Sequence, residues 1–428
     1  MTEEFDALER RPDTLLITLA GNDRPGLTSA TLATLALAGV DVVDLEQIVL
    51  RARLVLGLLV TAPADAASTD ALKHAIEETA HALDMTVEIE EGVGDTPREP
   101  SDRARVTVLG LPLKAAALAS VTRTIASAGG NIDRIIRLAR YPVTAFDLHV
   151  SGASPDELRV TLAAEAAAQG VDIAVQPANL VRRGMRLIVM DVDSTLIDGE
   201  VIEMIAAHAG YEKEVASVTE AAMRGELDFE ESLRGRVKYL KGVPATALDE
   251  VYAGLQLNPG ARTMVRTLRR LGYRFAIVSG GFSQITDRLA ADLGIHYARA
   301  NELEIVDGVL TGEVVGEVVD RAGKARALRE FAAEIGIPEA ATVAIGDGAN
   351  DLDMLAAAGL GIAYNAKPAV RSAAGTAINV PYLDTIMYLL GISREESRQF
   401  SVGRAVGLFG VLRRRRARPR RRAPSPPG

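Results

Sequence analysis

The sequence predicts an α/β protein in which a Rossmann-like, doubly wound parallel sheet with a helical cap insertion follows two βαββαβ units of the ferredoxin-like type. Short apolar runs alternate with helical stretches from about residue 185, which is typical of parallel strands buried on both faces. Before that point, one strand and helix pattern occurs twice, with a period of roughly 90 residues. The length of 428 residues allows about three domains.

The first unit is expected over residues 10–92. Leu15–Gly21 alternates as a strand does, and an Ala- and Leu-rich helix then runs to Gly39. Two strands (VDVVDLEQIVL and LVLGLLVTA), a helix around Ala71–Leu83 and a last strand (MTVEIEE) complete the order βαββαβ. The Gly- and Pro-rich linker Gly92–Asp102 indicates a domain boundary.

The second unit is expected over residues 102–180. RVTVLGLPL (Arg105–Leu113) matches the first strand and loop of the preceding unit, and Gly130 corresponds to Gly39. The strands NIDRIIRLAR and FDLHVSG, a helix at Pro155–Gln169 and the strand VDIAVQP follow. We therefore expect a second copy of the same fold.

The third domain is expected over residues 183–398. Its strands are RLIVM, YRFAIVSGG, ATVAIGDGAND and LGIAYNA, and the segment LEIVDGVLTGEVV predicts a hairpin with an Asp-Gly turn. A charged helical cap is expected at about 212–255. The remaining tail, 399–428, has eight Arg in the ten positions from Arg413 to Arg422. We expect this tail to be disordered, with contact to a membrane surface or a polyanion as the alternative.

The composition excludes several classes of function. The chain has no Cys, which excludes disulfides, thiolate zinc sites and thiol nucleophiles. It has no Trp, and aromatic residues make up only 4%. The net charge is −9, and without the eight Arg of 413–422 the remaining 40 basic and 57 acidic residues give −17, so no nucleic-acid partner is expected. The absence of a targeting signal and of a long apolar stretch predicts a cytoplasmic protein with no membrane span.

Acidic residues follow two of the predicted parallel strands. Asp191 and Asp193 come directly after RLIVM, and Asp347 follows ATVAIG. Neighbouring carboxylates at one sheet edge repel each other unless a cation compensates, and Mg²⁺ prefers oxygen ligands. The alternative is that each Asp caps the following helix, but the ordered set of motifs favours a magnesium site.

Phosphate-binding groups are expected beside these acids. Ser279 ends the strand YRFAIV, and its hydroxyl with the amides of Gly280 and Gly281 would form an anion pocket. Lys324, after the hairpin, is a point charge suited to phosphate oxygens. The alternatives are a plain helix cap for Ser279 and a solvated surface position for Lys324.

Together, DVDST, SGG, Lys324 and GDGAND resemble the four motifs of the haloacid dehalogenase superfamily of phosphotransferases over about residues 185–397. Within it, Gly199-Glu200 and FEESLRGRV at Phe229–Val237 resemble the phosphoserine phosphatases. The two N-terminal units resemble ACT domains, which sense amino acids. The whole chain thus resembles bacterial phosphoserine phosphatases with tandem ACT domains.

This resemblance implies an aspartyl-phosphate mechanism with Mg²⁺ as cofactor, and an inventory without Cys or a motif His also leaves a carboxylate as nucleophile. Asp191 would be the nucleophile and Asp193 the acid and base. Mg²⁺ would be held by Asp191, the Asp193 carbonyl and Asp347. Ser279, Gly280 and Lys324 would bind the transferring phosphoryl group. Asn350 and Asp351 would orient the metal-bound waters and Lys324, and Asn350 would also contact the substrate.

The implied substrate is O-phospho-L-serine, hydrolysed in the last step of serine biosynthesis. Glu200 would bind its ammonium group and Arg236 its carboxylate. Met223 and Phe229 would close the site as a lid. The alternatives are lid-core positions for Met223 and Phe229 and a surface ion pair for Arg236.

The ACT-like units imply regulation by L-serine and assembly as a homodimer or higher homo-oligomer. The implied effector loops contain Gly21, Asp23, Arg24 and Gly26 in the first unit and Gly110 in the second. The second loop, GLPL, lacks the charges of the first. An amino-acid-binding regulatory protein with a vestigial phosphatase domain, or a related Mg²⁺-dependent phosphatase for another small phosphomonoester, stays open.

Overall fold

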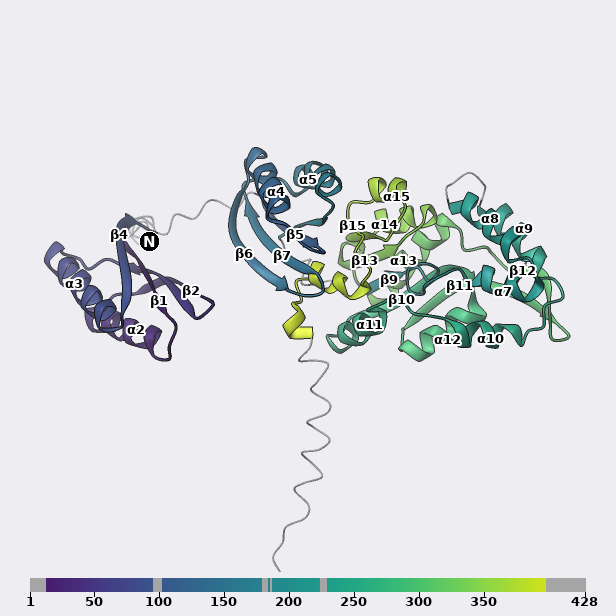
Figure 1. Ribbon diagram of the computed structural model, residues 1–428, viewed down its shortest axis with the longest axis horizontal. Helices are drawn as coiled ribbons and strands as arrows, with labels where there is room; N and C mark the ends of the chain where they lie inside the picture. The colour runs from purple at the N-terminus through teal and green to yellow at the C-terminus, as the bar shows by residue number, and fades with distance from the viewer. Residues whose placement is uncertain (1–12, 95–101, 179–183, 185–186, 224–228, 398–428) are drawn as a thin grey trace, which may run out of the picture. The chain divides into compact units, whose positions relative to one another are not determined.

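The computed structural model describes residues 13–94, 102–178, 184, 187–223 and 229–397 (Figure 1). The chain divides into two compact units, residues 1–100 and 101–428, each considered by itself. The predicted basic tail at 399–428 lies outside the described residues. Among the residues that are described, no helix is both long and apolar enough to cross a bilayer.

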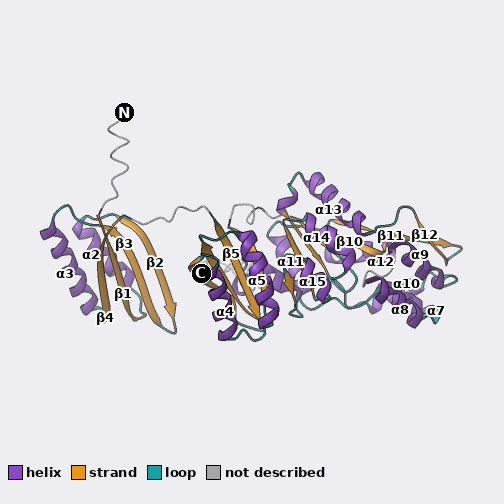
Figure 2. Ribbon diagram, turned by 90° about the horizontal axis from the view of Figure 1, so that it is seen from above, coloured by secondary structure: helices purple, strands orange, loops and turns teal. Residues whose placement is uncertain are grey.

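The first unit is a four-stranded antiparallel sheet in the order β2-β3-β1-β4, with both helices on one face (Figure 2). Leu15, Ile17 and Leu19 alternate toward those helices and form the core. The second helix begins earlier than the sequence predicts, because the Asp65 side chain accepts a hydrogen bond from the Ser68 N–H. The elements are β1 (Asp13–Asn22), α2 (Leu27–Ala38), β2 (Val42–Leu50), β3 (Arg53–Thr61), α3 (Ala66–Ala82) and β4 (Met85–Val93).

The second unit begins with the same arrangement of strands and helices. Its sheet order, β6-β7-β5-β8, corresponds strand for strand to that of the first unit, so the predicted repeat is confirmed. The elements are β5 (Arg103–Gly110), α4 (Ala115–Ser127), β6 (Asn131–Ala139), β7 (Thr144–Ser151), α5 (Pro155–Gln169) and β8 (Asp172–Pro177).

A seven-stranded sheet follows, in the order β12-β11-β10-β9-β13-β14-β15. All strands pair in parallel except β12, which forms the predicted hairpin with β11. The parallel pairing of β11 with β10 and the strand β15 were not predicted from the sequence. The strands are β9 (Leu187–Met190), β10 (Arg274–Phe282), β11 (Tyr297–Val306), β12 (Val309–Val315), β13 (Thr342–Gly346), β14 (Leu360–Tyr364) and β15 (Ala377–Ile378).

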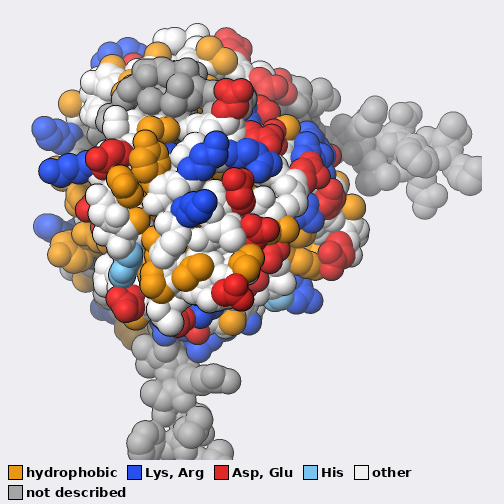
Figure 3. All heavy atoms as spheres, turned by 90° about the vertical axis from the view of Figure 1, so that its right-hand side faces the viewer, with side chains coloured by type: hydrophobic (Ala, Val, Ile, Leu, Met, Phe, Trp, Pro, Cys, Tyr) orange, Lys and Arg blue, Asp and Glu red, His pale blue; other side chains and the backbone are white. Residues whose placement is uncertain are grey.

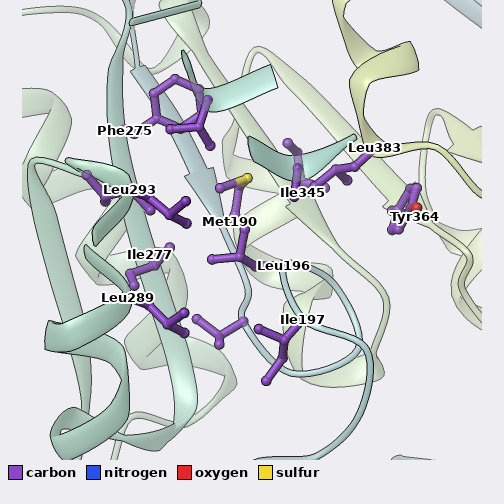
Figure 4. Packing of buried hydrophobic residues seen from close by; sticks show 14 of the residues in the cluster. Met190, Leu196, Ile197, Phe275, Ile277, Leu289, Leu293, Ile345, Tyr364 and Leu383 are labelled. Carbon is purple, nitrogen blue, oxygen red and sulfur yellow. The ribbon is translucent and has the colours of Figure 1, made fainter. Parts of the chain in front are cut away.

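Apolar side chains on both faces of this sheet produce the doubly wound architecture. Met190 and Ile277 face one layer with Phe275 and Leu289 (Figure 4), whereas Val189 lies in the opposite layer. The first layer includes α11 (Ala261–Arg270), α12 (Ser283–Leu293), η4 (Leu383–Thr385) and α16 (Ile386–Leu389), and the second includes α13 (Arg321–Ile335), η3 (Ala349–Asp351), α14 (Leu352–Ala357) and α15 (Pro368–Ala373), with η2 (Glu339–Ala341) before β13.

The cap insertion lies between β9 and β10 in the chain. Its segment 242–245 is joined to the β11–β12 hairpin by backbone hydrogen bonds, among them Gly242 N–H to Leu310 O at 2.8 Å. Figure 3 views the face that carries α8, α9 and β12, where basic and acidic side chains are interspersed. The helices that precede and form the cap are α7 (Val201–Ala209), α8 (Glu212–Met223), α9 (Phe229–Val237), η1 (Lys238–Leu240) and α10 (Ala247–Gly254).

The second βαββαβ fold has a core of its own, and further apolar residues of its sheet pack into the core of the seven-stranded sheet. Apolar residues of its sheet, such as Leu109 and Ala145, belong to the same buried cluster as Met190. The buried Asp172 carboxylate of β8 accepts hydrogen bonds from Asn379 N–H (2.8 Å), Asn379 Nδ2 (2.7 Å) and Val380 N–H (3.2 Å). Gln176 Nε2 donates to Leu389 O at 2.8 Å. These contacts make residues 102–178 and 187–397 one packed body.

Candidate active site

The carboxyl ends of β9 and β13 meet at the point where the strand order reverses, since β10 lies on one side of β9 and β13 on the other. Such a switch point leaves a crevice at the sheet edge, which is where ligands bind in this architecture. Asp191 follows β9, and Asp347 follows β13. The Asp191 N–H donates to Ile345 O at 2.9 Å, which joins the two strand ends directly.

Three carboxylates surround a lysine at this edge. Oxygen atoms of Asp191, Asp347 and Asp351 lie within 4.8 Å of one another. Lys324 Nζ lies 2.7 Å from Asp191 Oδ2 and 2.8 Å from Asp351 Oδ1, and its side chain is completely buried. The sequence predicts that these four residues lie at one site, and the structure brings them together there.

The electrostatics of this cluster call for another cation. Burial, followed by repulsion from Asp351, raises the pKa of Asp191 well above its usual range, and the same causes raise the pKa of Asp347 to about 7. Burial opposes the charge on Lys324, but the Asp191 and Asp351 carboxylates more than offset it and raise its pKa. One lysine leaves an excess of acid, and the oxygen donors of Asp191 and Asp347 fit a hard cation such as Mg²⁺.

Asp351 is held by two backbone N–H groups of the loop that carries Asp347, in addition to Lys324. Oδ2 accepts the N–H groups of Asp347 (3.1 Å) and Gly348 (3.0 Å), and Oδ1 faces Lys324. Asp351 can therefore orient the Asp347 loop and Lys324. Asn350, its neighbour in η3, lines the cavity in front of Asp191.

The carboxylate of Asp193 points away from the acidic cluster. Oδ1 accepts the Val201 N–H at 2.8 Å, and Oδ2 accepts the Ser279 hydroxyl at 3.1 Å. Burial raises the pKa of Asp193, although both hydrogen bonds oppose the shift. A carboxyl in this position can hold and release a proton while its backbone carbonyl is free to contact a metal.

Ser279, Gly280 and Gly281 lie near the end of β10, where its pairing with β11 shifts register, and this irregular segment forms a tight loop beside Asp193. The Gly281 N–H donates to Ser279 Oγ at 2.8 Å. A Cβ on Gly281 would lie 2.8 Å from Asp193 Oδ2, and one on Gly280 would lie 2.7 Å from the Phe229 ring. A side chain at either position would therefore displace Phe229 or the Asp193 carboxylate, and Phe229 from α9 closes over the loop as a lid residue would.

Charged groups from the cap complete the cavity. Arg236 is 6% exposed, and its Nη1 donates to Thr219 Oγ1 at 2.9 Å while its Nε donates to Ser232 O at 3.3 Å. Glu200 Oε1 accepts the Ser194 hydroxyl at 2.7 Å. Burial, then repulsion from Asp193, raises the pKa of Glu200 to about 8, and burial lowers the pKa of Arg236.

The cavity brings together eight of the predicted residues: Asp191, Asp193, Glu200, Phe229, Arg236, Gly280, Gly281 and Asn350. Met223 is the last residue of α8, and its side chain lies outside what the structure describes. Sequence reasoning missed Thr219, which binds Arg236, and Asn258, whose Nδ2 donates to Thr195 O at 2.8 Å and Ile197 O at 3.1 Å. Neither lies in a motif, and no local signal marks either of them.

The predicted effector residues of the first unit surround the β1–α2 loop. Asp23 N–H donates to Ala52 O at 2.7 Å, and Arg24 Nη2 donates to Leu83 O at 2.7 Å. Gly26 begins α2 with a φ of 99°, which favours glycine, and a Cβ on Gly21 would lie 2.9 Å from Met85 Cγ. In the second unit, Gly110 ends β5, where a Cβ would lie 2.8 Å from Leu113 Cα. These contacts explain the loops' shapes.

Comparison with known proteins places the chain among named families. Residues 188–356 match the haloacid dehalogenase-like hydrolase model, and residues 13–90 and 103–176 each match an ACT domain model. A phosphoserine phosphatase of Streptomyces coelicolor is 60% identical and covers 90% of this chain and 93% of its own length. One from Mycobacterium tuberculosis is 51% identical, over 91% of this chain and 96% of its own.

Solved structures agree with these relatives. A probable phosphoserine phosphatase from Vibrio cholerae superposes with a TM-score of 0.51 at 35% identity, over 69% of this chain and 88% of its own. A HAD family hydrolase from Salmonella enterica serovar Typhi gives a TM-score of 0.58 at 30% identity, over 67% of this chain and 98% of its own.

Proposed function

The chain belongs to the phosphoserine phosphatases, a family of haloacid dehalogenase-like hydrolases, and on this premise we propose that it hydrolyses O-phospho-L-serine through an aspartyl-phosphate on Asp191. The observation that carries the mechanism is that the carboxyl groups of Asp191 and Asp193 have different surroundings. Asp191 Oδ2 lies against Lys324 in the acidic cluster, whereas Asp193 is hydrogen-bonded outside that cluster. Two carboxyls in different environments can take the roles of nucleophile and proton carrier.

In the first step, an Asp191 oxygen forms a bond to phosphorus and the bond from phosphorus to the seryl oxygen breaks. Asp193 gives its proton to that oxygen, which leaves as the serine hydroxyl. In the second step, water attacks the phosphorus, Asp193 takes a proton from the water, and the acyl phosphate bond breaks to restore the Asp191 carboxylate. The burial that raises the pKa of Asp193 favours the protonated form that the first step needs.

We propose that Mg²⁺ is held by Asp191, Asp347 and the Asp193 backbone carbonyl. The buried acidic cluster supports this choice, because Lys324 alone does not balance the negative charge of its three carboxylates. The bound ion neutralises charge on the phosphoryl oxygens. Asp351 holds Lys324 and the Asp347 loop in place, and Lys324, Ser279 and Gly280 bind the transferring phosphoryl group, with Asn350 beside it.

The serine end of the substrate would lie between the charged cap residues. Glu200 faces the ammonium group and Arg236 the carboxylate, each held by one hydroxyl partner, Ser194 and Thr219 respectively. Phe229, packed over Gly280, excludes water from the phosphoryl group, and we assign Met223 to the same lid.

We also propose that L-serine regulates the enzyme through the ACT-like domains, that the chain acts as a homodimer or higher homo-oligomer, and that it works in the cytoplasm. The two ACT domain matches support the amino-acid ligand. The charged loop with Asp23 and Arg24 favours the first domain as the binding site over the uncharged loop at Gly110. Calorimetric titration of the full chain with L-serine tests this assignment, and the proposal fails if no heat of binding is seen or if Arg24→Ala leaves it unchanged.

Release of phosphate from O-phospho-L-serine, compared with a panel of sugar and aryl phosphates, tests the reaction. The proposal expects phosphoserine to be the preferred substrate with Mg²⁺ present and Asp191→Asn to abolish turnover. Preference for another phosphomonoester would support the alternative substrate class, and serine binding without turnover by the unmodified chain would support the vestigial alternative.

A further inference from the structure

Asn301, near the middle of β11, lies outside every motif and uses both ends of its side-chain amide. It is 1% exposed. Its Nδ2 donates to Gly280 O at 2.8 Å, and its Oδ1 accepts the Val319 N–H at 2.8 Å. A buried amide with both ends bonded to backbone has only one orientation that satisfies it.

The two partners belong to segments that lead to different phosphoryl-binding groups. Gly280 lies in the loop that carries Ser279. Val319 directly precedes Asp320, which caps α13, the helix that carries Lys324. The pairing of β10 with β11 shifts register between Val278 and Phe282, so the regular strand ladder is interrupted where this loop lies. The Asn301 amide therefore replaces regular strand pairing at the loop.

The hydrogen bond from Asn301 to Gly280 is connected to Ser279 by one peptide group. The Gly280 carbonyl, which accepts from Asn301, and the Gly281 N–H belong to one rigid peptide unit and point to opposite sides. That Gly281 N–H donates to Ser279 Oγ, and the Ser279 hydroxyl donates to Asp193 Oδ2. The hydrogen bonds thus run in one direction, from Asn301 through the peptide and Ser279 to Asp193.

We propose that Asn301 is a positioning residue for phosphoryl transfer, which orients the Ser279 hydroxyl through the Gly280–Gly281 peptide. The inference rests on the proposed role of Ser279 in binding the phosphoryl group. Asn301 does not touch the substrate. It keeps the phosphoryl-binding loop in the arrangement that the bound group requires.

The variant Asn301→Asp removes the donor with little change in shape. A carboxylate still accepts the Val319 N–H, but its other oxygen faces the Gly280 carbonyl and repels it. Gln284 offers a matched control, because its amide also bridges to β11, with Nε2 donating to Leu303 O at 2.8 Å and Oε1 accepting the Leu303 N–H at 3.3 Å. Gln284→Glu makes the same chemical change in α12, at contacts with Leu303 rather than with Gly280. Asn301→Ser, which adds no charge, is measured beside them.

The test measures kcat and KM for O-phospho-L-serine and p-nitrophenyl phosphate, and the inhibition constant of inorganic phosphate. We expect both Asn301 variants to raise the inhibition constant of phosphate and both KM values about tenfold, equivalent to about 1.4 kcal/mol, because all three compounds share the group that the loop binds. Gln284→Glu should leave these constants unchanged. A merely structural role would lower kcat through fewer active molecules, since such a loss does not alter an inhibition constant.

Ser279→Ala separates failure of the inference from failure of the proposed function. If Ser279→Ala leaves the phosphate inhibition constant unchanged, the proposed role of Ser279 is wrong and the inference fails with it. If Ser279→Ala raises that constant but a folded Asn301 variant does not, only the inference about Asn301 is overturned. An equal rise in Gln284→Glu would likewise overturn it.

Discussion

Replacing Lys324 by methionine removes the one buried cation that the structure describes within the acidic cluster. The side chain is completely buried, and its ammonium group lies 2.7 Å from Asp191 and 2.8 Å from Asp351. Methionine keeps the unbranched four-atom stem and lacks only the terminal ammonium group, so the main change is one positive charge. Lys324→Met leaves the carboxylates of Asp191, Asp347 and Asp351 close together without it.

The expected loss of stability follows from that geometry. Removing one partner of a buried ion pair costs about 3–5 kcal/mol, because an unpaired charge stays behind. For a large domain each kcal/mol corresponds to about 2–4 °C, so we expect the melting temperature of the second unit to fall by roughly 10 °C without Mg²⁺. Mg²⁺ should then raise the melting temperature of the variant more than that of the unmodified chain, since it meets one more uncompensated negative charge.

Thermal unfolding with and without Mg²⁺, together with phosphate release, measures these effects. Turnover should fall at least about 100-fold even at saturating Mg²⁺, because Lys324 is the proposed donor to the transferring phosphoryl group. Lys367→Met, at an exposed position, is the control and should change none of these quantities. A melting temperature for Lys324→Met equal to that of the control, with no added stabilisation by Mg²⁺, would refute the charge argument.

Three further predictions concern the cap and the domain junction. Arg236→Ala should raise KM for phosphoserine about 100-fold, because a buried guanidinium contact to a carboxylate is worth about 2–3 kcal/mol. KM for p-nitrophenyl phosphate, which has no such carboxylate, should hardly change. Equal losses on both substrates would reject the carboxylate assignment. KM for phosphoserine should fall as pH rises through about 8, where Glu200 loses its proton, and Glu200→Gln should abolish this slope; a slope that persists in the variant would assign it to another group. Asp172→Ala should lower the melting temperature of the second unit by about 5 °C, because it leaves three N–H donors unpaired. Asp156→Ala, at an exposed position, is the control. An unchanged melting temperature for Asp172→Ala would mean that the junction contributes no stability.

The alternation of strands and helices and the acidic motifs could be predicted from the sequence because their signals are local. Asp191 and Asp193 stand directly after an apolar run, and a parallel sheet places the ends of such runs at one edge. Asn258 and Asn301 carry no such signal. Each acts through partners distant in the chain, Thr195 for Asn258 and Gly280 for Asn301, so their roles exist only after the chain has folded.

The domain junction escaped prediction for a similar reason. Asp172 looks like the polar start of a short strand, VDIAVQP, and nothing near it indicates that its carboxylate binds the backbone at Asn379 and Val380. The sequence repeat predicts two equivalent sensor units. The structure distinguishes them, because the core of residues 13–94 is made from that unit alone, whereas the second copy contributes to the catalytic core.

This shared core limits how such a chain can be shortened, by engineering or over evolutionary time. Removing residues 1–100 deletes a unit with its own interior and cuts none of the hydrogen bonds at Asp172 or Gln176. Removing everything before residue 184 would instead expose Leu389, Met387 and their apolar neighbours and leave the Leu389 carbonyl without Gln176. A functional fragment that lacks both repeats would therefore need new polar side chains on that surface.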